Sequence, residues 1–272
     1  MIHFVKHLNS GKINYLIHRQ YYYGLCKSCK QYNTFYNWCQ TCNPKTIIQG
    51  WSNSDVIDDL VKNCIKEFQS KAIMHDDVIE WIPFNKLGKI QKIGEGGFGL
   101  VYSAIWLDSI RVTEYNKSKW VKTRKKSKVV LKTLPNPQDL FKCLKEFKNH
   151  MQCRLMGSEL KIYGLTKSTK MIEHYEFNAG DYLMVLQFAN NRSLNKCLEN
   201  NFKELIWECK LSQLIDISYD LIKIHKAGYT HSDFHSGNIC KIKLENLYFL
   251  TLQILDYLRK SKNTIKMKKF LE

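Results

Sequence analysis

Four glycines within six residues most constrain what this chain can fold into. They lie in the run Gly94-Glu-Gly-Gly-Phe-Gly99, and the run that follows, Leu-Val-Tyr-Ser-Ala-Ile-Trp, has the character of a strand. A doubly wound dinucleotide-binding fold requires a helix directly after such glycines. The sequence instead predicts a hairpin between two strands. Glycine at its tip would let the backbone close over phosphates without Cβ clashes.

The order of the expected elements indicates segregated strands and helices. Apolar, β-rich runs occupy residues 86–94, 99–106, 127–134, 160–165 and 182–188, with a charged insertion at 107–128. Apolar residues have helical spacing over 140–151 and from Leu211 to Ile222, where Gly228 is placed to end the helix. This order is typical of an α+β fold. Upstream, residues 51–73 have the spacing of one amphipathic helix, with a capping box at Ser52 and Asp55.

The ten cysteines divide into two groups. Four form the pairs Cys26-Lys-Ser-Cys29 and Cys39-Gln-Thr-Cys42, and the other six are scattered, as free thiols are in a reducing compartment. Two such pairs supply the four thiolates of a tetrahedral zinc site, and a closed site of this kind is structural rather than catalytic. The alternative is a cluster of reduced cysteines without metal. The spacing favours zinc.

Charge and hydropathy narrow the class of protein. The 272 residues contain 42 Lys and Arg against 25 Asp and Glu, and the net charge of +17 attracts partners that bear phosphates. The longest apolar run, Leu247 to Leu255, is shorter than the ~20 residues of a membrane helix. The N-terminus lacks an apolar stretch followed by a small-residue cleavage site. We therefore expect no membrane association and an intracellular, cytoplasmic protein.

Two groups of polar residues follow the glycine-rich hairpin. Lys132 ends an apolar strand, where an ammonium group can reach phosphates, and Glu146 on the next helix could hold that ammonium in place. The run from His231 to Asn238 comes directly after the long helix. Its Asp233 and Asn238 offer a base that orients a hydroxyl and a metal ligand. Alone, this run is equally well explained as a polar connection between a helix and a strand.

Together and in this order, these elements resemble the eukaryotic protein kinase domain. The resemblance covers roughly residues 88–240. It is similar to the tyrosine-kinase-like branch, and more closely to expanded fungal kinases that carry a paired-cysteine segment upstream. It implies an α+β, protein kinase-like fold with a complete N-lobe and a partial C-lobe, preceded by a small zinc-ribbon-like segment. It also implies transfer of the γ-phosphate of ATP to a protein hydroxyl, with Mg²⁺ as cofactor.

The resemblance assigns roles to particular residues. Lys132 would contact the α- and β-phosphates and pair with Glu146, Asp233 would be the catalytic base and Asn238 a magnesium ligand. Leu186 would be the gatekeeper beside an adenine-binding hinge. The nucleotide-binding set would be Gly94, Gly96, Gly97, Gly99, Val101, Val130, Lys132, Gln187, Ala189 and Asn238.

Three departures from the kinase pattern bear on specificity. Val130 stands where a small alanine usually covers the adenine ring, which narrows the pocket. Ser232 replaces the arginine that commonly receives an activation-loop phosphate. His235 occupies the position of the serine/threonine-kinase lysine without matching the tyrosine-kinase version. The sequence therefore does not choose between serine/threonine and tyrosine specificity.

The segment after Asn238 departs further, because it contains no Asp-Phe-Gly or Ala-Pro-Glu motif. The expectation is a domain truncated after the catalytic loop, with impaired transfer. One interpretation of residues 241–272 is a basic amphipathic helix. A degenerate metal-binding triplet at Asp256-Tyr-Leu258 is not favoured, because its glycine is missing. A second hypothesis is a frameshift, because codons for Leu252 to Arg259 can encode Thr-Asp-Phe-Gly-Leu-Ser-Lys in another frame.

The expected organisation is a basic leader (1–20), a four-cysteine zinc segment (21–46), an amphipathic linker helix (51–79) and a kinase domain (80–272). Within the last, the N-lobe spans about 85–190, the partial C-lobe 191–240 and an aberrant tail 241–272. Two other functions remain open: a nucleic-acid-binding protein that uses the zinc segment and the basic charge, and a zinc-stabilised scaffold with an inactive kinase fold. Nucleic acid is not favoured, because the lysines are spread through the insertion and the tail.

Overall fold

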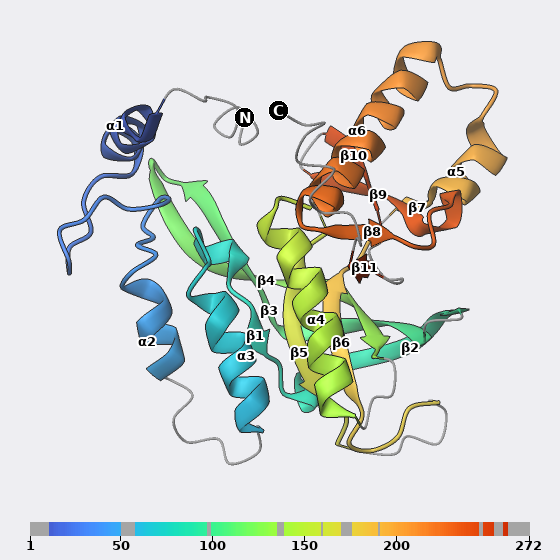
Figure 1. Cartoon of the computed structure of the whole chain (residues 1–272), viewed down its shortest axis with the longest axis horizontal. Coiled ribbons are helices and arrows are strands. Elements are labelled where there is room, and N and C mark those ends of the chain that lie inside the picture. Colours follow the sequence, from blue (N-terminus) through green and yellow to red (C-terminus); the bar gives the residue numbers. More distant parts are fainter. Residues whose placement is uncertain are drawn as a thin grey trace. The chain divides into compact units, whose positions relative to one another are not determined.

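The computed structural model describes residues 11–49, 58–96, 99–134, 139–158, 160–169, 176–189, 191–244, 247–252 and 258–260. The chain divides into two compact units, one of Met1–Trp81 with Leu107–Ser127 and one of Ile82–Trp106 with Lys128–Glu272. Figure 1 labels the helices and strands of both. Each unit is therefore built from two stretches of chain that are separated in sequence.

The first unit begins with α1 (Gly11–Tyr23), which is followed by the two cysteine turns, α2 (Asn43–Gln49) and α3 (Asp59–Gln69). A 3-10 helix η2 (His75–Asp77) and β1 (Glu80–Trp81) complete its N-terminal part. Asp58 caps α3 by accepting a hydrogen bond from the Leu60 amide. One face of α3 is buried, through Val61, Cys64, Ile65 and Phe68. A small separate core consists of Trp38, Ala72 and Val78.

Two expectations for this part of the chain are wrong in their bounds. Residues 11–20, expected to be a featureless leader, are helical. Arg19 fixes α1 to the cysteine segment by donating from Nε to the Asn33 carbonyl at 2.8 Å, and Asn33 donates back to the Tyr23 carbonyl at 2.9 Å. The helix expected over 51–73 is shorter, because its cap is Asp58 and it ends at Gln69. The capping box at Ser52 and Asp55 lies outside the described residues.

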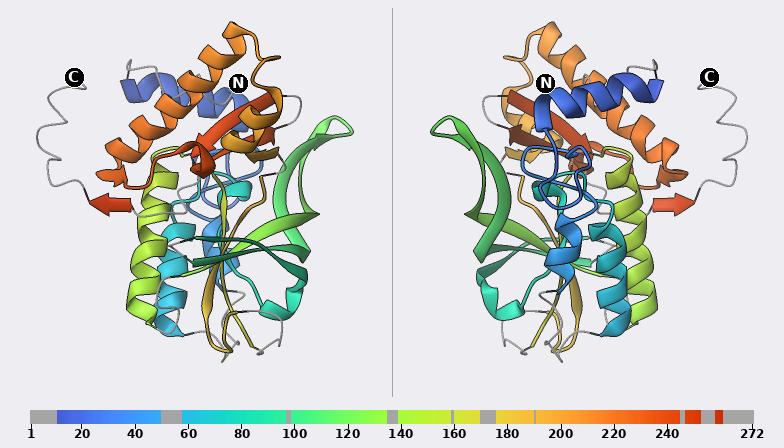
Figure 2. Two further views of the ribbon diagram at one scale, coloured as in Figure 1. Left: turned by 90° about the vertical axis from the view of Figure 1, so that its right-hand side faces the viewer. Right: turned by 90° about the vertical axis from the view of Figure 1, so that its left-hand side faces the viewer.

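The charged insertion at 107–128 extends two strands rather than separating them. Figure 2 shows β3 (Gly99–Asn116) and β4 (Lys119–Thr133) continuing as one two-stranded ribbon. Its turn lies at Lys117 and Ser118, whose φ angles are 44° and 64°. Two successive positive φ values belong to the tight turns whose twist matches that of the flanking strands. The outer part of this ribbon, residues 107–127, belongs to the first unit.

The second unit contains a sheet of antiparallel strands. β2 (Leu87–Gly96), β3, β4, β5 (Ile162–Lys167) and β6 (Tyr182–Gln187) lie in the order β5-β6-β4-β3-β2. β4 pairs with β6, with Val130 opposite Leu186 and Lys132 opposite Met184. The strands predicted from the five apolar runs are thus confirmed. A 3-10 helix η3 (Phe84–Lys86) precedes β2.

Three helices and two small sheets complete the second unit. The helices are α4 (Leu140–Leu155), α5 (Leu194–Asn201) and α6 (Trp207–Lys226). β7 (Asn191–Ser193), β9 (Ile239–Leu244) and β10 (Leu247–Leu252) form one sheet, and β8 (Tyr229–His231) pairs with β11 (Leu258–Lys260). A 3-10 helix η4 (Ser236–Asn238) lies between β8 and β9. The two predicted helices are confirmed, and Gly228, with φ 85°, follows the end of α6. α4, α6, β8 and β9 share a core of Cys153, Ile217, Ile224, Tyr229 and Ile239.

The helix predicted over 241–272 is wrong for the residues that the structure describes there. Residues 247–252 form β10, which pairs with β9 from Leu247 opposite Leu244 to Leu252 opposite Ile239. A helix over these residues would leave the backbone groups of β9 on that side unpaired. The triplet at 256–258 and the frameshift hypothesis fall mainly on residues 253–257, which lie outside the described residues.

Candidate functional site

The glycine-rich segment is a hairpin between β2 and β3, as predicted. Gly94 lies opposite Val101, and Gly96 lies opposite Gly99. Gly97 and Phe98 lie outside the described residues. These pairs bring backbone amides of both strands to one end of the hairpin. Three of the four paired residues are glycines and have no side chain. Such a backbone surface can approach an anionic ligand closely.

Gly99 shows why one position in this hairpin requires glycine. Its φ is 123°, and a Cβ atom built on it would lie 2.7 Å from Thr133 Oγ1 and 2.9 Å from the Thr133 carbonyl oxygen. The Leu100 amide donates to Thr133 Oγ1 at 2.8 Å. Thr133, which directly follows Lys132 in β4, thus fastens the hairpin to β4. Sequence reasoning did not single out Thr133, and its type alone gives no signal.

Lys132 is a buried cation with an acidic partner. Its side chain is almost fully enclosed in β4, and Nζ lies 3.3 Å from Glu146 Oε1 on α4. His150, one helical turn further along α4, lies 3.5 Å from the same oxygen. Burial acts to raise the pKa of Glu146, but the hydrogen bond from His150 and the charge of Lys132 outweigh it and lower that pKa below its ordinary value of 4.5. The structure therefore brings Lys132 and Glu146 together, and adds His150, which sequence reasoning missed.

Helix α4 also contacts the segment that leads into the polar loop. Tyr229 in β8 donates its hydroxyl to Asn149 Oδ1 at 3.0 Å, and Asn149 is three residues after Glu146. Cys153, one turn further, lies in the core that α6 and β8 share. One helix thus positions Glu146 beside Lys132 and fixes β8, which begins four residues before Asp233. Asn149 and Tyr229 are further positioning residues that sequence reasoning did not find.

The polar loop from Asp233 to Asn238 is organised by hydrogen bonds among its own residues. Asn238, which is 9% exposed, donates from Nδ2 to Asp233 Oδ2 at 2.8 Å and to the Asp233 carbonyl at 3.0 Å. His235 Nε2 lies 3.3 Å from the same carboxylate oxygen, and His235 Nδ1 accepts from the Gly237 amide at 3.1 Å. The Asp233 side chain is about one-third exposed (36%). An accessible carboxylate in a fixed orientation is what a base acting on a hydroxyl requires.

The remaining predicted nucleotide-binding residues lie on the central strands. Val130 on β4 and Leu186 on β6 are buried opposite each other, and Val101 on β3 is half-buried. β6 ends at Gln187, whose amide donates to the Lys161 carbonyl at 2.9 Å. Ala189 follows and is half-buried. The structure thus places Val101, Val130, Leu186 and Gln187 on the same sheet as Lys132, and Ala189 just beyond the end of β6.

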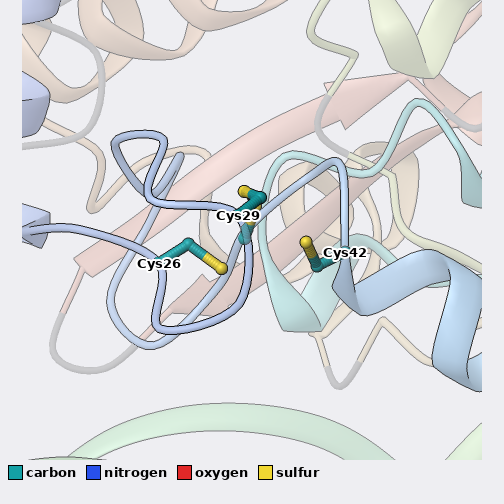
Figure 3. Close-up of side chains that lie close together, drawn as sticks. Cys26, Cys29 and Cys42 are labelled. Carbon is teal, nitrogen blue, oxygen red and sulfur yellow. The ribbon is translucent and has the colours of Figure 1, made fainter.

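The four paired cysteines form a cluster in the first unit. Their sulfur atoms all lie within 4.8 Å of one another, and Cys29 Sγ and Cys39 Sγ are 3.6 Å apart. All four are free thiols. Figure 3 shows the side chains of Cys26, Cys29 and Cys42 close together. Tetrahedral zinc with Zn–S bonds of about 2.3 Å requires sulfurs about 3.8 Å apart, so the donor set fits this metal.

The acidities within this cluster differ. The pKa of Cys26 is lowered from 9.0 to about 6, chiefly because the Cys29 amide donates to its sulfur; burial opposes this shift, and the Ser28 amide adds to it. The pKa of Cys42 is raised to about 12, because its thiol forms a hydrogen bond with Cys29 and is desolvated. Four adjacent thiols cannot all ionise unless a cation lies among them. By contrast, burial raises the pKa of Cys143, Cys153 and Cys240, which lie outside the cluster, to about 12.

Comparison with protein families identifies the class to which this geometry belongs. The sequence model of the family described as "protein tyrosine and serine/threonine kinase" matches residues 87–247, more than half of the chain. The chain therefore belongs to this protein kinase family, whose members use ATP and Mg²⁺. No curated protein matches the chain. Within the described residues, every helix is too short or too polar to cross a membrane.

Proposed function

We propose that this chain binds ATP in its second unit and transfers the γ-phosphate to a hydroxyl group of a protein. The observation that carries this proposal is the pair of Lys132 and Glu146, 3.3 Å apart. A lysine side chain is rarely buried so completely unless its charge is paired. Phosphates can supply the second partner for this ammonium group. The tyrosine-kinase-like branch and the likeness to fungal kinases are part of the proposal.

In the proposed complex, the hairpin of Gly94 to Gly99 covers the phosphates with its backbone amides. Lys132 contacts the α- and β-phosphates and pairs with the Glu146 carboxylate, which His150 holds in place. Val101, Val130 and Leu186 enclose the adenine ring, and the backbone from Gln187 to Ala189 binds its edge. The larger Val130 favours a narrower pocket than alanine would give.

Asp233 is the proposed base for the accepting hydroxyl. The Asn238 amide nitrogen donates to its carboxylate and fixes the direction of that group. This leaves the Asn238 carbonyl oxygen as the atom that would ligate Mg²⁺, and a hard oxygen suits that ion. Bound Mg²⁺ neutralises charge on the phosphates. The choice between serine/threonine and tyrosine hydroxyls is left to experiment.

The proposal is tested by ATP affinity and by phosphate transfer from labelled ATP to peptide libraries with a fixed serine, threonine or tyrosine. We expect Lys132→Met to weaken ATP binding about 10- to 100-fold, because a hydrogen bond between charged groups is worth about 1.5–3 kcal/mol. Asp233→Asn should retain ATP affinity and lose transfer, because it keeps the shape of the side chain but removes the base.

Lys145→Met is the matched control, because Lys145 is an exposed lysine next to Glu146 on α4. It should leave both measurements unchanged. Equal ATP affinity of the wild-type and Lys132→Met proteins would contradict the nucleotide site. Transfer that survives in Asp233→Asn would contradict the assigned base.

We further propose that the four-cysteine cluster binds one structural zinc ion. Cys26, Cys29, Cys39 and Cys42 would each contribute one thiolate, and a site with four protein ligands has no open position for catalysis. The zinc would join the two turns that carry the cysteine pairs. Support comes from the sulfur distances and from the amides directed at Cys26.

Native mass spectrometry of the whole chain measures the metal content. We expect one zinc per chain, lost in Cys39→Ser and retained in Cys209→Ser, because Cys209 is an exposed cysteine of the second unit. Metal-free protein with the four thiols joined as disulfides would contradict the zinc site.

A further inference from the structure

Seven ring side chains of the first unit form a continuous row, called here the aromatic row: Tyr21, Tyr22, His18, Tyr23, Tyr36, Trp120 and Tyr115. At its centre Tyr36 stacks on Trp120, with ring centroids 4.0 Å apart and planes 12° from parallel. Tyr23 contacts Tyr36 edge-on at 4.9 Å, and Tyr115 contacts Trp120 at 5.5 Å. His18 lies between Tyr22 and Tyr23, 4.5 and 5.5 Å from them, and Tyr21 meets Tyr22 at 4.9 Å. The row runs from α1 through the second cysteine turn to the tip of the β3–β4 ribbon.

Both ends of the aromatic row are open to solvent. Tyr21 is 80% exposed and Tyr22 52% exposed at one end, and Tyr115 is 63% exposed at the other. Tyr23, Tyr36 and Trp120 are half-buried. These rings therefore keep accessible area although they touch one another. A contiguous exposed aromatic surface on a folded protein marks a site of interaction.

The chain segments that carry the aromatic row are rich in exposed basic residues. Residues 11–49 contain no aspartate or glutamate, and of their four lysines Lys27, Lys30 and Lys45 are exposed. The ribbon tip adds the exposed Lys117 and Lys119. The nearest acidic residue along the ribbon, Glu114, is already engaged by Lys125 and Thr123.

The fold gathers basic residues that are scattered in the sequence. Asn37, in the second cysteine turn, donates to the Trp120 carbonyl at 2.6 Å, and Tyr36 stacks on the Trp120 ring. These contacts place the lysine-rich insertion against the cysteine segment, about eighty residues earlier in the chain. The spread of lysines along the sequence counted against nucleic-acid binding. For the lysines of the insertion this argument does not hold, because the fold brings the insertion to the cysteine segment.

We propose that the aromatic row and the lysines beside it bind single-stranded nucleic acid. Unpaired bases stack on aromatic rings whatever their sequence, and lysines beside the rings pair with the phosphates. A duplex keeps its bases stacked inside and offers only phosphates to such a surface. A proline-rich peptide could use the rings, but it would not use the surplus of cations. The combination of rings and cations therefore favours a single strand.

The test measures fluorescence anisotropy of the zinc-loaded whole chain with labelled 12-mers of oligo-U and oligo-dT, and with a duplex of the same length. We expect both single strands to bind more tightly than the duplex, and the two arms to show whether RNA or DNA is preferred. Because ATP is absent, the outcome is independent of phosphoryl transfer.

Variants separate stacking from charge. Tyr21→Ala and Tyr115→Ala should each weaken single-strand binding about 5- to 100-fold, whereas Tyr115→Phe, which keeps the ring, should bind as the wild type does. Lys117→Gln should lower the salt dependence by about 0.7 in the slope of log K against log salt. Tyr219→Ala and Lys145→Gln, on exposed positions of the second unit, are the matched controls. Unchanged circular dichroism spectra and thermal unfolding show that the variants fold.

The proposal would be overturned by no binding of either single strand, by duplex binding at least as tight as single-strand binding, or by tighter binding of a proline-rich 12-mer peptide. Binding that salt abolishes, but that neither Tyr21→Ala nor Tyr115→Ala weakens, would be charge attraction alone. It too would exclude a stacking site.

Discussion

At the residue scale, the proposed kinase site consists of ordinary side chains held in unusual surroundings. Lys132 is enclosed and paired, and Gly99 has no room for a Cβ atom. The contacts of Lys132 with Glu146 could be predicted because the two residue types and their spacing are distinctive, and the role proposed for Asp233 stays a prediction. Those of Thr133, Asn149 and His150 could not, because threonine, asparagine and histidine acquire such roles only where the fold brings a partner to them.

Gly99 gives the first prediction at this scale. Gly99→Ala should lower the free energy of unfolding by about 1–3 kcal/mol and weaken ATP binding, because alanine is strained at φ 123° and would collide with Thr133. Gly94→Ala is the control, since a Cβ there would meet only the Val101 side chain at 3.9 Å. Chemical denaturation of both variants measures the difference. Equal stabilities would show that the hairpin does not press against Thr133.

His75 gives a prediction on pH. Burial, and then the charges of Arg111, Lys122 and Arg124, lower the pKa of His75 from 6.5 to about 4. Above pH 6.5 the folded and unfolded states are both neutral at this residue. Between pH 6.5 and 4 only the unfolded state binds the proton, so stability falls as pH falls through this window.

The expected loss between pH 7 and pH 5 is about 2 kcal/mol of unfolding free energy. His75→Gln should remove this part of the pH dependence and leave any part due to the cysteine thiolates. Denaturant titrations of both proteins at the two pH values make the comparison. A difference between pH 7 and pH 5 that is the same in both proteins would contradict the shift at His75.

At the element scale, α4 connects the parts of the proposed kinase site. Its Glu146 pairs with Lys132, its Asn149 accepts a hydrogen bond from the Tyr229 hydroxyl, and its Cys153 is part of the buried core. Asp139 caps its first turn by accepting from the Lys142 amide at 3.1 Å. A single rigid helix can fix the positions of groups that lie on separate sheets.

Loss of the hydrogen bond between Tyr229 and Asn149 should weaken the connection between β8 and α4. Tyr229→Phe removes the hydroxyl that donates to Asn149 and should cost about 1 kcal/mol of stability. If that bond positions the Asp233 loop, kcat should fall while ATP affinity is retained. Tyr219→Phe, at a partly exposed position of α6, is the control for loss of a hydroxyl. An unchanged kcat in Tyr229→Phe would restrict Asn149 to a structural role.

Elements with a local signal were predictable, and those that depend on distant partners were not. The five β-rich runs and the helices α4 and α6 have clear periodicity, and the structure contains them. α1 depends on Arg19 and Asn33, and β10 depends on its ladder with β9, so periodicity alone suggested a loose leader and a helical tail. The extent of the β3–β4 ribbon likewise depends on its contacts with the cysteine segment.

At the scale of the whole molecule, the two units are not successive along the chain. The strands β3 and β4 contribute their inner parts to the second unit and residues 107–127 to the first. In the first unit, Glu80 pairs with both Arg111 and Arg124 at 2.8 Å, and Thr113 donates to Asp76 at 2.7 Å. The insertion is therefore a structural part of the cysteine-containing unit.

The last prediction follows from this division. Replacing residues 107–127 with a two-residue Asn-Gly turn should leave the second unit folded, because a tight turn can join the shortened strands. The first unit would lose the Trp120 stack on Tyr36 and both arginine partners of Glu80. We expect ATP affinity to persist, while zinc is released at a lower chelator concentration. A protein that keeps the ribbon but carries Trp120→Ala and Arg124→Ala should also release zinc at a lower chelator concentration, but with a smaller change. Unchanged zinc retention in the shortened protein would mean that the cysteine segment is stable without the ribbon.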